Sequence, residues 1–245
     1  MFDRYKKVLI FDTETTGLDP KEDRIIEFGM MVLQRESCEE KFCLQTEVSV
    51  LVKHNNLELP EKITEITGIT QEDLDRSGIT EERLFGLIAA HFLKNQEETL
   101  LIAYNAGFDI AFVESLLSRY LFKTSDASCL MADILDPLTI FRDRHRGPHK
   151  LSDAIAYYGA DGVNSHRAID DVRALFCVLK KMALEKNNID LYINHLGYNP
   201  YYGPGKNRIP RIHYIGQEGG QYEIEAHVSQ RTNMSYSFDF RQPKG

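Results

Sequence analysis

The chain has 245 residues, a net charge of −8 and four cysteines. A length of this order suits one large domain, or one domain with a small appendage, and buries enough surface to need no disulfide or structural metal. The acidic balance argues against a simple DNA-binding module, because such modules neutralise phosphates with lysine and arginine. It argues less against a nuclease that holds divalent cations, since the cations carry local positive charge.

The cysteine pattern and the hydropathy pattern predict a cytoplasmic protein. Cys38, Cys43, Cys129 and Cys177 form no C-x-x-C pair and have apolar neighbours, so we expect reduced thiols rather than a zinc site or a disulfide framework. No apolar run approaches the roughly 20 residues that cross a bilayer, and the apolar stretch at residues 8–11 is too short for a signal peptide. We therefore expect no membrane partner.

The first third of the chain predicts three strands and a short helix. Residues 7–11, 25–33 and 42–52 are rich in β-branched or aromatic residues, and the short polar gaps between them suit an antiparallel meander. Residues 60–66 then predict a helix that ends at Gly68.

The middle of the chain predicts alternating helices and strands. Thr80 begins a helix, because two glutamates follow it and apolar residues then recur at helical spacing. One more buried strand and three more helices are predicted at residues 99–104, 107–120, 153–158 and 168–186. Ser152 is expected to cap the third of these four elements. The order predicts an α/β fold in which helices cover a mixed sheet.

The composition changes near residue 190, where tyrosines and turn residues become frequent. We predict a main domain at 1–190 and a small β-rich appendage at 191–245, in which residues 208–215 and 221–228 pair as strands across two glycines. The tyrosines of the appendage, together with Lys206, Arg208 and Arg211, either guide a single nucleic-acid strand or pack against the main domain or a partner.

Two acids follow the first predicted strand. Asp12 and Glu14 are two residues apart, so both side chains point to the same face of the strand. Acids at the end of a buried strand are costly unless they bind a cation, and Mg²⁺ prefers carboxylate oxygens. Two other interpretations stay open: a turn cap beside a surface acid, or a phosphatase with Asp12 as its nucleophile. A phosphatase of that kind usually has Asp rather than Glu at the second position.

Further acids and a histidine occur at the ends of other predicted elements. Asp109 lies in the first turn of a predicted helix, and His166 comes just before the long helix that carries Asp171. Each alone is commonly a helix-dipole partner or a capping residue. Four acids and one histidine, each near the end of a regular element, favour a shared site.

The three segments together, Asp-x-Glu, Asn-x-x-Phe-Asp and His-x-Ala-x-x-Asp, resemble the DEDDh branch of the DnaQ-like exonuclease superfamily. That superfamily includes the proofreading epsilon subunit of bacterial DNA polymerase III. The resemblance covers about residues 7–182, and residues 60–70 and 149–151 also look like this family. It implies a ribonuclease H-like fold, with a mixed five-stranded sheet flanked by helices, and removal of nucleoside 5′-monophosphates in the 3′→5′ direction.

The resemblance also implies roles for particular residues. Asp12, Glu14, Asp109 and Asp171 would hold two Mg²⁺ or Mn²⁺ ions, and His166 would be the general base. Contacts to the terminal nucleotide would come from the residues Thr13, Thr15, Thr16, Leu18, Asn105 and Phe108. The expected partners are single-stranded 3′ ends of DNA or RNA, and either a DNA polymerase subunit or a second copy of the chain. The rival functions are an aspartyl phosphatase and an inactive nucleic-acid-binding module.

Overall fold

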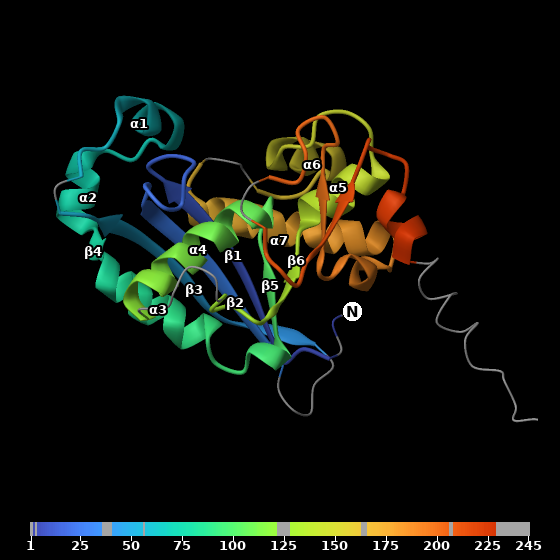
Figure 1. Cartoon of the computed structure of the whole chain (residues 1–245), viewed down its shortest axis with the longest axis horizontal. Coiled ribbons are helices and arrows are strands. Elements are labelled where there is room, and N and C mark those ends of the chain that lie inside the picture. The colour runs from blue at the N-terminus through green and yellow to red at the C-terminus, as the bar shows by residue number, and fades with distance from the viewer. Residues whose placement is uncertain are drawn as a thin grey trace, which may run out of the picture.

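The computed structural model describes residues 2, 4–35, 41–55, 57–121, 128–162, 166–205 and 208–228. In this part of the chain a mixed sheet lies between helices on both of its faces (Figure 1). Its strands are β1 (Lys7–Thr15), β2 (Ile25–Arg35), β3 (Phe42–Lys53), β4 (Ile79–Thr80), β5 (Thr99–Ile102) and β6 (Asp133–Leu135). The α/β class is confirmed, and the two-residue β4 adds a sixth strand to the expected sheet.

The strand order is β4-β3-β2-β1-β5-β6. β1 pairs antiparallel with β2, and β2 pairs antiparallel with β3, which confirms the predicted meander. β5 and β6 continue the sheet parallel to β1. The pairing with β2 continues beyond residue 11 as far as Thr15, so β1 is longer than predicted and includes both Asp12 and Glu14.

Seven labelled helices cover the sheet or extend from its edge in the described residues, and residues 223–228 form a further helical segment. The labelled helices are α1 (Glu61–Thr67), α2 (Gln71–Ser77), α3 (Glu81–Phe92), α4 (Ala106–Leu121), α5 (Pro137–Arg144), α6 (Leu151–Tyr158) and α7 (Ala168–Glu185). The prediction of a cap at Ser152 was wrong, because α6 begins at Leu151, two residues before the predicted start. The backbone N–H of Lys150 there donates to the Asp153 carboxylate at 2.7 Å. No described helix is both long and apolar enough to cross a bilayer.

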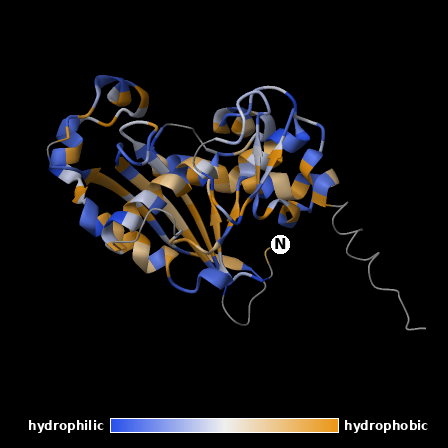
Figure 2. Ribbon diagram, viewed as in Figure 1, coloured by the Kyte–Doolittle hydropathy of each residue, from blue (hydrophilic) through white to orange (hydrophobic). Residues whose placement is uncertain are grey.

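Alternate residues of the strands enter two separate cores. Leu9 and Phe11 of β1 pack in the core beneath α3 and α4, whereas Val8 and Ile10 pack in the core beneath α5, α6 and α7. This alternation follows from the two-residue period of a strand that is buried on both faces. Figure 2 shows that hydrophobic residues are concentrated on the central strands. The sheet therefore separates two layers of helices.

Helix α7 approaches the sheet unusually closely at Gly29 of β2. A β-carbon at Gly29 would lie 2.5 Å from the carbonyl carbon of Ala168, the first residue of α7. Only glycine leaves room for that backbone. The close approach brings the N-terminus of α7 beside the β1 residue paired with Gly29, which is Asp12.

The predicted hairpin of residues 208–215 and 221–228 was wrong. β8 (His213–Gly216) pairs instead with β7 (His195–Tyr198), and residues 223–228 are helical. The buried Asp143 of α5 explains the difference, because its carboxylate accepts hydrogen bonds from Ile224 N–H at 3.0 Å and from Gln217 Nε2 at 3.1 Å. Residues after 190 also enter both cores, through Leu196 on one face and Tyr192 on the other. The domain boundary at 190 stays a prediction.

Candidate active site

Two acids project from the last part of β1. Asp12 lies opposite Gly29 and Glu14 lies opposite Glu27 in the pairing with β2. Because the two residues are two positions apart, both carboxylates point to the same side of the sheet. Both line a cavity of about 760 Å³ at the end of the strand.

Asp109 reaches the same cavity from the first turn of α4. It is buried, and its Oδ1 accepts two hydrogen bonds from Thr13, at 2.9 Å from the backbone N–H and at 2.7 Å from the hydroxyl. Asn105 begins this helix with a positive φ of 64°, a conformation that asparagine tolerates better than most residues. Thr13 therefore fixes the Asp109 carboxylate beside the two acids of β1.

Asp171 and His166 reach the cavity from the opposite helical layer. Asp171 is buried in the first turn of α7, and the exposed His166 lies two residues before that helix with a left-handed φ of 54°. This left-handed conformation is uncommon for residues other than glycine, although histidine adopts it more readily than most. One ligand atom each from Glu14, His166 and Asp171 lie within 4.8 Å of one another.

Glu27 anchors this part of α7 to the sheet. Its carboxylate is fully buried and accepts hydrogen bonds from Arg167 Nη2 at 2.9 Å and from Ala168 N–H at 3.1 Å. Both donors lie between His166 and Asp171 in the chain. Glu27 was missed by the sequence analysis, although a charged residue inside an apolar strand is a signal that could have identified it.

The four carboxylates concentrate negative charge at this cavity, and the charge of Arg167 offsets only part of it at Glu14. Burial, followed by repulsion from Asp109, Glu14 and Asp171, raises the pKa of Asp12 well above its ordinary value. Burial and the charge of Asp171 raise the pKa of Glu14 to about 8. Burial raises the pKa of Asp109 to about 7, although its hydrogen bonds from Thr13 act in the opposite direction. Each acid therefore resists ionisation unless positive charge enters the cavity.

The donor set fits hard divalent cations. Four carboxylates that face one cavity provide the oxygen ligands that Mg²⁺ and Mn²⁺ prefer. The raised pKa values of Asp12, Glu14 and Asp109 reflect burial among like charges, which is typical of a site completed by metal ions.

Comparison with known proteins identifies the family. Residues 9–179 match the model of a family described as exonuclease, and this stretch contains all four acids and His166. The chain belongs to the exonuclease family. Within that family, the DNA polymerase III epsilon subunit of Treponema pallidum is 32% identical over 164 residues, covering 66% of this chain and 70% of that protein.

Other relatives of this exonuclease-family chain are longer. The PolC-type DNA polymerase III of Thermotoga maritima is 30% identical over 166 residues, which are 67% of this chain but only 11% of that polymerase. Among solved structures, exonuclease I of E. coli in complex with a dT13 oligonucleotide has a TM-score of 0.60 at 19% identity. The match covers 76% of this chain and 42% of exonuclease I, and it supports the fold.

The metal-free form of the exonuclease-family chain should lose stability as the pH rises. The pKa of Glu14 is about 8 in the folded state against an ordinary value of 4.5, and that of Asp109 is about 7 against 3.8. The folded state therefore binds more protons than the unfolded state between about pH 4 and pH 8, so the free energy of unfolding falls through that window. We expect the melting temperature in chelator to fall between about pH 5.5 and pH 8.5.

Divalent cations should reverse this loss, because ions that bind only the folded state stabilise it. Mg²⁺ should therefore raise the melting temperature more at pH 8.5 than at pH 5.5, and Asp12→Asn should reduce both the pH effect and the Mg²⁺ effect. A melting temperature that does not respond to Mg²⁺ at pH 8.5 would exclude a cation site among these acids.

The six predicted substrate contacts fall into two groups. Thr13, Asn105 and Phe108 line the cavity, with Phe108 half-buried against Phe112. The other three, Thr15, Thr16 and Leu18, do not line it. The Thr15 hydroxyl donates to Gly17 O at 2.6 Å, and the Thr16 hydroxyl donates to Asp23 Oδ1 at 3.0 Å. These two hydroxyls therefore hold the backbone that follows β1 in place. Leu18, in contrast, is 84% exposed.

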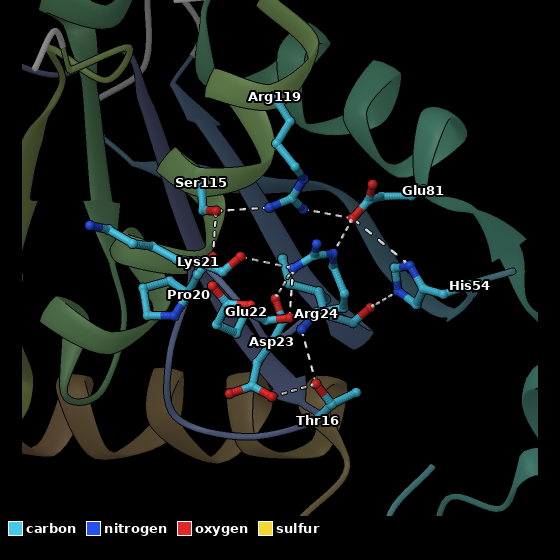
Figure 3. A network of polar contacts seen from close by, with 11 residues as sticks. Thr16, Pro20, Lys21, Glu22, Asp23, Arg24, His54, Glu81, Ser115 and Arg119 are labelled. Carbon is cyan, nitrogen blue, oxygen red and sulfur yellow. Dashed lines mark hydrogen bonds and ion pairs between the residues drawn. The ribbon is translucent and has the colours of Figure 1, made fainter. Parts of the chain in front are cut away.

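A polar network holds residues 16–24, called here the 16–24 loop, against helices α3 and α4 (Figure 3). The Glu81 carboxylate of α3 lies 2.6 Å from Arg119 Nη2 and 3.9 Å from Arg24 Nε. Arg119 also donates to the Ser115 hydroxyl at 2.8 Å, and that hydroxyl donates to Pro20 O. The network therefore connects the loop that carries Leu18 with the helix that carries Asp109.

Basic and aromatic side chains also line the cavity. Arg142, His149 and Lys150 line it together with Tyr104, whose hydroxyl donates to His149 O at 2.8 Å. The sequence analysis named residues 149–151 as a family-like segment but gave them no role, and it missed Arg142 and Tyr104. The cavity therefore combines acidic and basic side chains, which suits a phosphodiester held beside cations.

Proposed function

We propose that this chain is a divalent-metal-dependent 3′→5′ exonuclease that releases nucleoside 5′-monophosphates from single-stranded 3′ ends. The observation that supports it most strongly is the convergence of Asp12, Glu14, Asp109, Asp171 and His166 on one cavity, in a chain of the exonuclease family. The acids come from the sheet and from both helical layers, so chance proximity along the chain does not explain their meeting.

Each side chain has a role in this proposal. Two ions of Mg²⁺ or Mn²⁺, held by the four acids, would supply positive charge to the reacting phosphate and its leaving oxygen and would acidify water. His166 accepts the proton of the attacking water, since a neutral imidazole is an effective base near neutral pH. Thr13 holds the Asp109 carboxylate in place through its two hydrogen bonds. Arg142 and Lys150, which also line the cavity, attract the phosphate backbone.

The relatives support DNA as the substrate and a replicative or repair role. The solved neighbour exonuclease I was crystallised with a dT13 oligonucleotide, and the epsilon relative is a DNA polymerase III subunit. By this proposal the chain acts on DNA ends, with RNA as the alternative polymer, and works in the cytoplasm. It acts beside a DNA polymerase or as a homodimer.

The cavity favours this function over the phosphatase. An Asp12 nucleophile would attack a phosphate from among three other buried or half-buried carboxylates, and their charge would repel the substrate unless metal ions were present. The complete set of four acids likewise argues against an inactive binding module.

Polarity and metal dependence test the proposal. A single-stranded oligonucleotide with a 5′ label should give a ladder of progressively shorter products in Mg²⁺ and no products in excess chelator. The same oligonucleotide with a labelled 3′ nucleotide should release labelled mononucleotide at once. Release of the 5′ nucleotide first would refute the assigned direction, and hydrolysis of a small phosphomonoester alone would favour the phosphatase.

Loosening the 16–24 loop should weaken substrate binding more than it slows chemistry. In Glu81→Gln the amide keeps its shape but loses the charge that attracts Arg24 and Arg119. We expect KM for a single strand to rise by about three- to tenfold, the effect of about 1 kcal/mol, while kcat changes less than twofold. Glu72→Gln, which alters an exposed partner of Arg76, is the matched control. Equal KM values for the two variants would show that the network does not position the loop.

A further inference from the structure

Two large aromatic rings stand exposed beside the cavity. Tyr201 is 86% exposed and Tyr202 is 80% exposed, and their ring centroids lie 4.9 Å apart with the planes at 87°. Rings of this size are normally buried to a large extent, so two adjacent exposed rings are typical of a binding surface. Among the described residues, the hydrophobic clusters include neither ring.

The turn that carries these rings is built on a residue of the cavity wall. Asn199 lines the cavity that also contains the four acids. Its side-chain Oδ1 accepts the Tyr201 N–H at 2.9 Å, and its carbonyl accepts the N–H groups of Tyr202 and Gly203, each at 3.0 Å. The two rings therefore lie within a few residues of the cavity, in a turn whose backbone is fixed by hydrogen bonds.

The strand before the turn is fastened to the helices of the site. Gly197 N–H donates to the Thr139 hydroxyl at 2.8 Å, and Gly197 O accepts a hydrogen bond from Arg142 at 3.2 Å. A β-carbon at Gly107, in the first turn of α4, would lie 3.9 Å from Leu196 Cδ1. β7 thus runs beside the helix terminus that presents Asp109, and the turn forms a rim of the same site.

We propose that Tyr201 and Tyr202 are a stacking platform for a base of single-stranded nucleic acid, upstream of the nucleotide that occupies the cavity. The inference rests on the proposed exonuclease function, because a strand whose 3′ terminus lies among the acids must leave the cavity across its rim. Arg142 and Lys150 on the wall attract its phosphates. Aromatic rings stack on any base, so the platform grips the strand without reading its sequence.

Binding as a function of strand length tests the platform. Asp12→Asn serves as the background so that the strand is not consumed, and 5′-labelled single strands from dinucleotide to about ten nucleotides are titrated in Mg²⁺. With both tyrosines present, the affinity should rise sharply at the length that first reaches the rim. We call this rise in affinity with strand length the affinity step. In the Tyr201→Ala/Tyr202→Ala variant the step should be smaller by about five- to a hundredfold, the loss expected for one stacked base. The affinity for the dinucleotide should be unchanged.

Two control variants separate stacking from folding. Tyr222→Ala removes another exposed ring of the C-terminal region, which is 44% exposed and lies beneath Lys186 Nζ. This variant should keep the affinity step. Tyr201→Phe/Tyr202→Phe keeps both rings and should also keep it. If the phenylalanine variant loses the step, or if the alanine variant retains it, the platform is refuted.

An abasic site moved along the strand locates the stacked base. When the tyrosines are present, the abasic site should weaken binding at one position of the strand. In the alanine variant an abasic site at that position should have no additional effect. Equal losses of affinity in both proteins would refute the platform. Failure of the proposed function gives a different result, because the protein with Asp12 intact would then release no nucleotide from a 3′ end in Mg²⁺. The length-dependent binding needs no hydrolysis.

Discussion

Asp12→Asn is expected to slow nucleotide release by about a thousandfold or more, because it removes a proposed cation ligand from the acidic cluster. The same substitution should stabilise the metal-free protein at pH 8, since the pKa of Asp12 is raised by burial and by repulsion from Asp109, Glu14 and Asp171. Loss of activity together with a higher melting temperature in chelator is an unusual combination that a misfolded variant cannot produce. Release from a 3′-labelled strand and thermal unfolding measure the two effects.

Asp170→Asn is the matched control for this experiment. Asp170 precedes the cavity-lining Asp171 in α7, but its carboxylate pairs with Arg173 at the surface, at 3.3 Å. We expect nearly normal activity from this variant. Comparable losses in the Asp12 and Asp170 variants would mean that the site depends on overall acidity rather than on the acids that line the cavity.

Glu27→Ala should reduce both stability and activity. The substitution leaves the buried N–H of Ala168 without its acceptor and frees Arg167, which is bound through its Nε and Nη2. Losing one partner of a buried pair costs about 3–5 kcal/mol, and we expect the lower end because the Arg167 side chain is 47% exposed. Activity should fall further than stability alone explains, because Glu27 holds the segment of chain that lies between His166 and Asp171.

Denaturant unfolding and single-strand digestion at low temperature, where the variant is still folded, separate the two losses for Glu27→Ala. Glu47→Ala removes the partner of Arg173 at a solvent-accessible pair and should cost only about 0–1 kcal/mol without affecting turnover. Unchanged turnover in folded Glu27→Ala would assign Glu27 a purely structural role.

The hydrophobic pattern along the sequence was sufficient to predict the strands and helices in which buried residues recur at regular spacing. The strands β1, β2 and β3, and the helices α4 and α7, appear where their hydrophobic periods placed them, within a few residues. Asp109 and Asp171 lie near the starts of their helices as predicted, whereas Asp12 and Glu14 lie within β1 rather than after it. Their roles as ligands, and that of His166 as base, stay predictions.

Long-range contacts account for what the pattern did not predict. The pair of Glu27 and Arg167 joins residues 140 positions apart, so no local window contains it. In the C-terminal region, Gly219 and Gly220 suggested a hairpin, but Gly220 N–H donates to Arg142 O at 2.9 Å and the chain follows α5 instead. The hydrogen-bonding demand of the buried Asp143 decided that path, and it cannot be seen before the fold is known.

The position of the acids on three layers makes turnover sensitive to packing far from the cavity. Asp109 belongs to α4 on one side of the sheet and Asp171 to α7 on the other, whereas Asp12 and Glu14 lie in the sheet between them. Any repacking that slides one helix by a fraction of an ångström changes the spacing of the carboxylates, because dense interiors transmit such shifts. Conservative exchanges such as Val113→Ile or Val178→Ile therefore offer a way to tune the catalytic rate from either interior without altering a polar group.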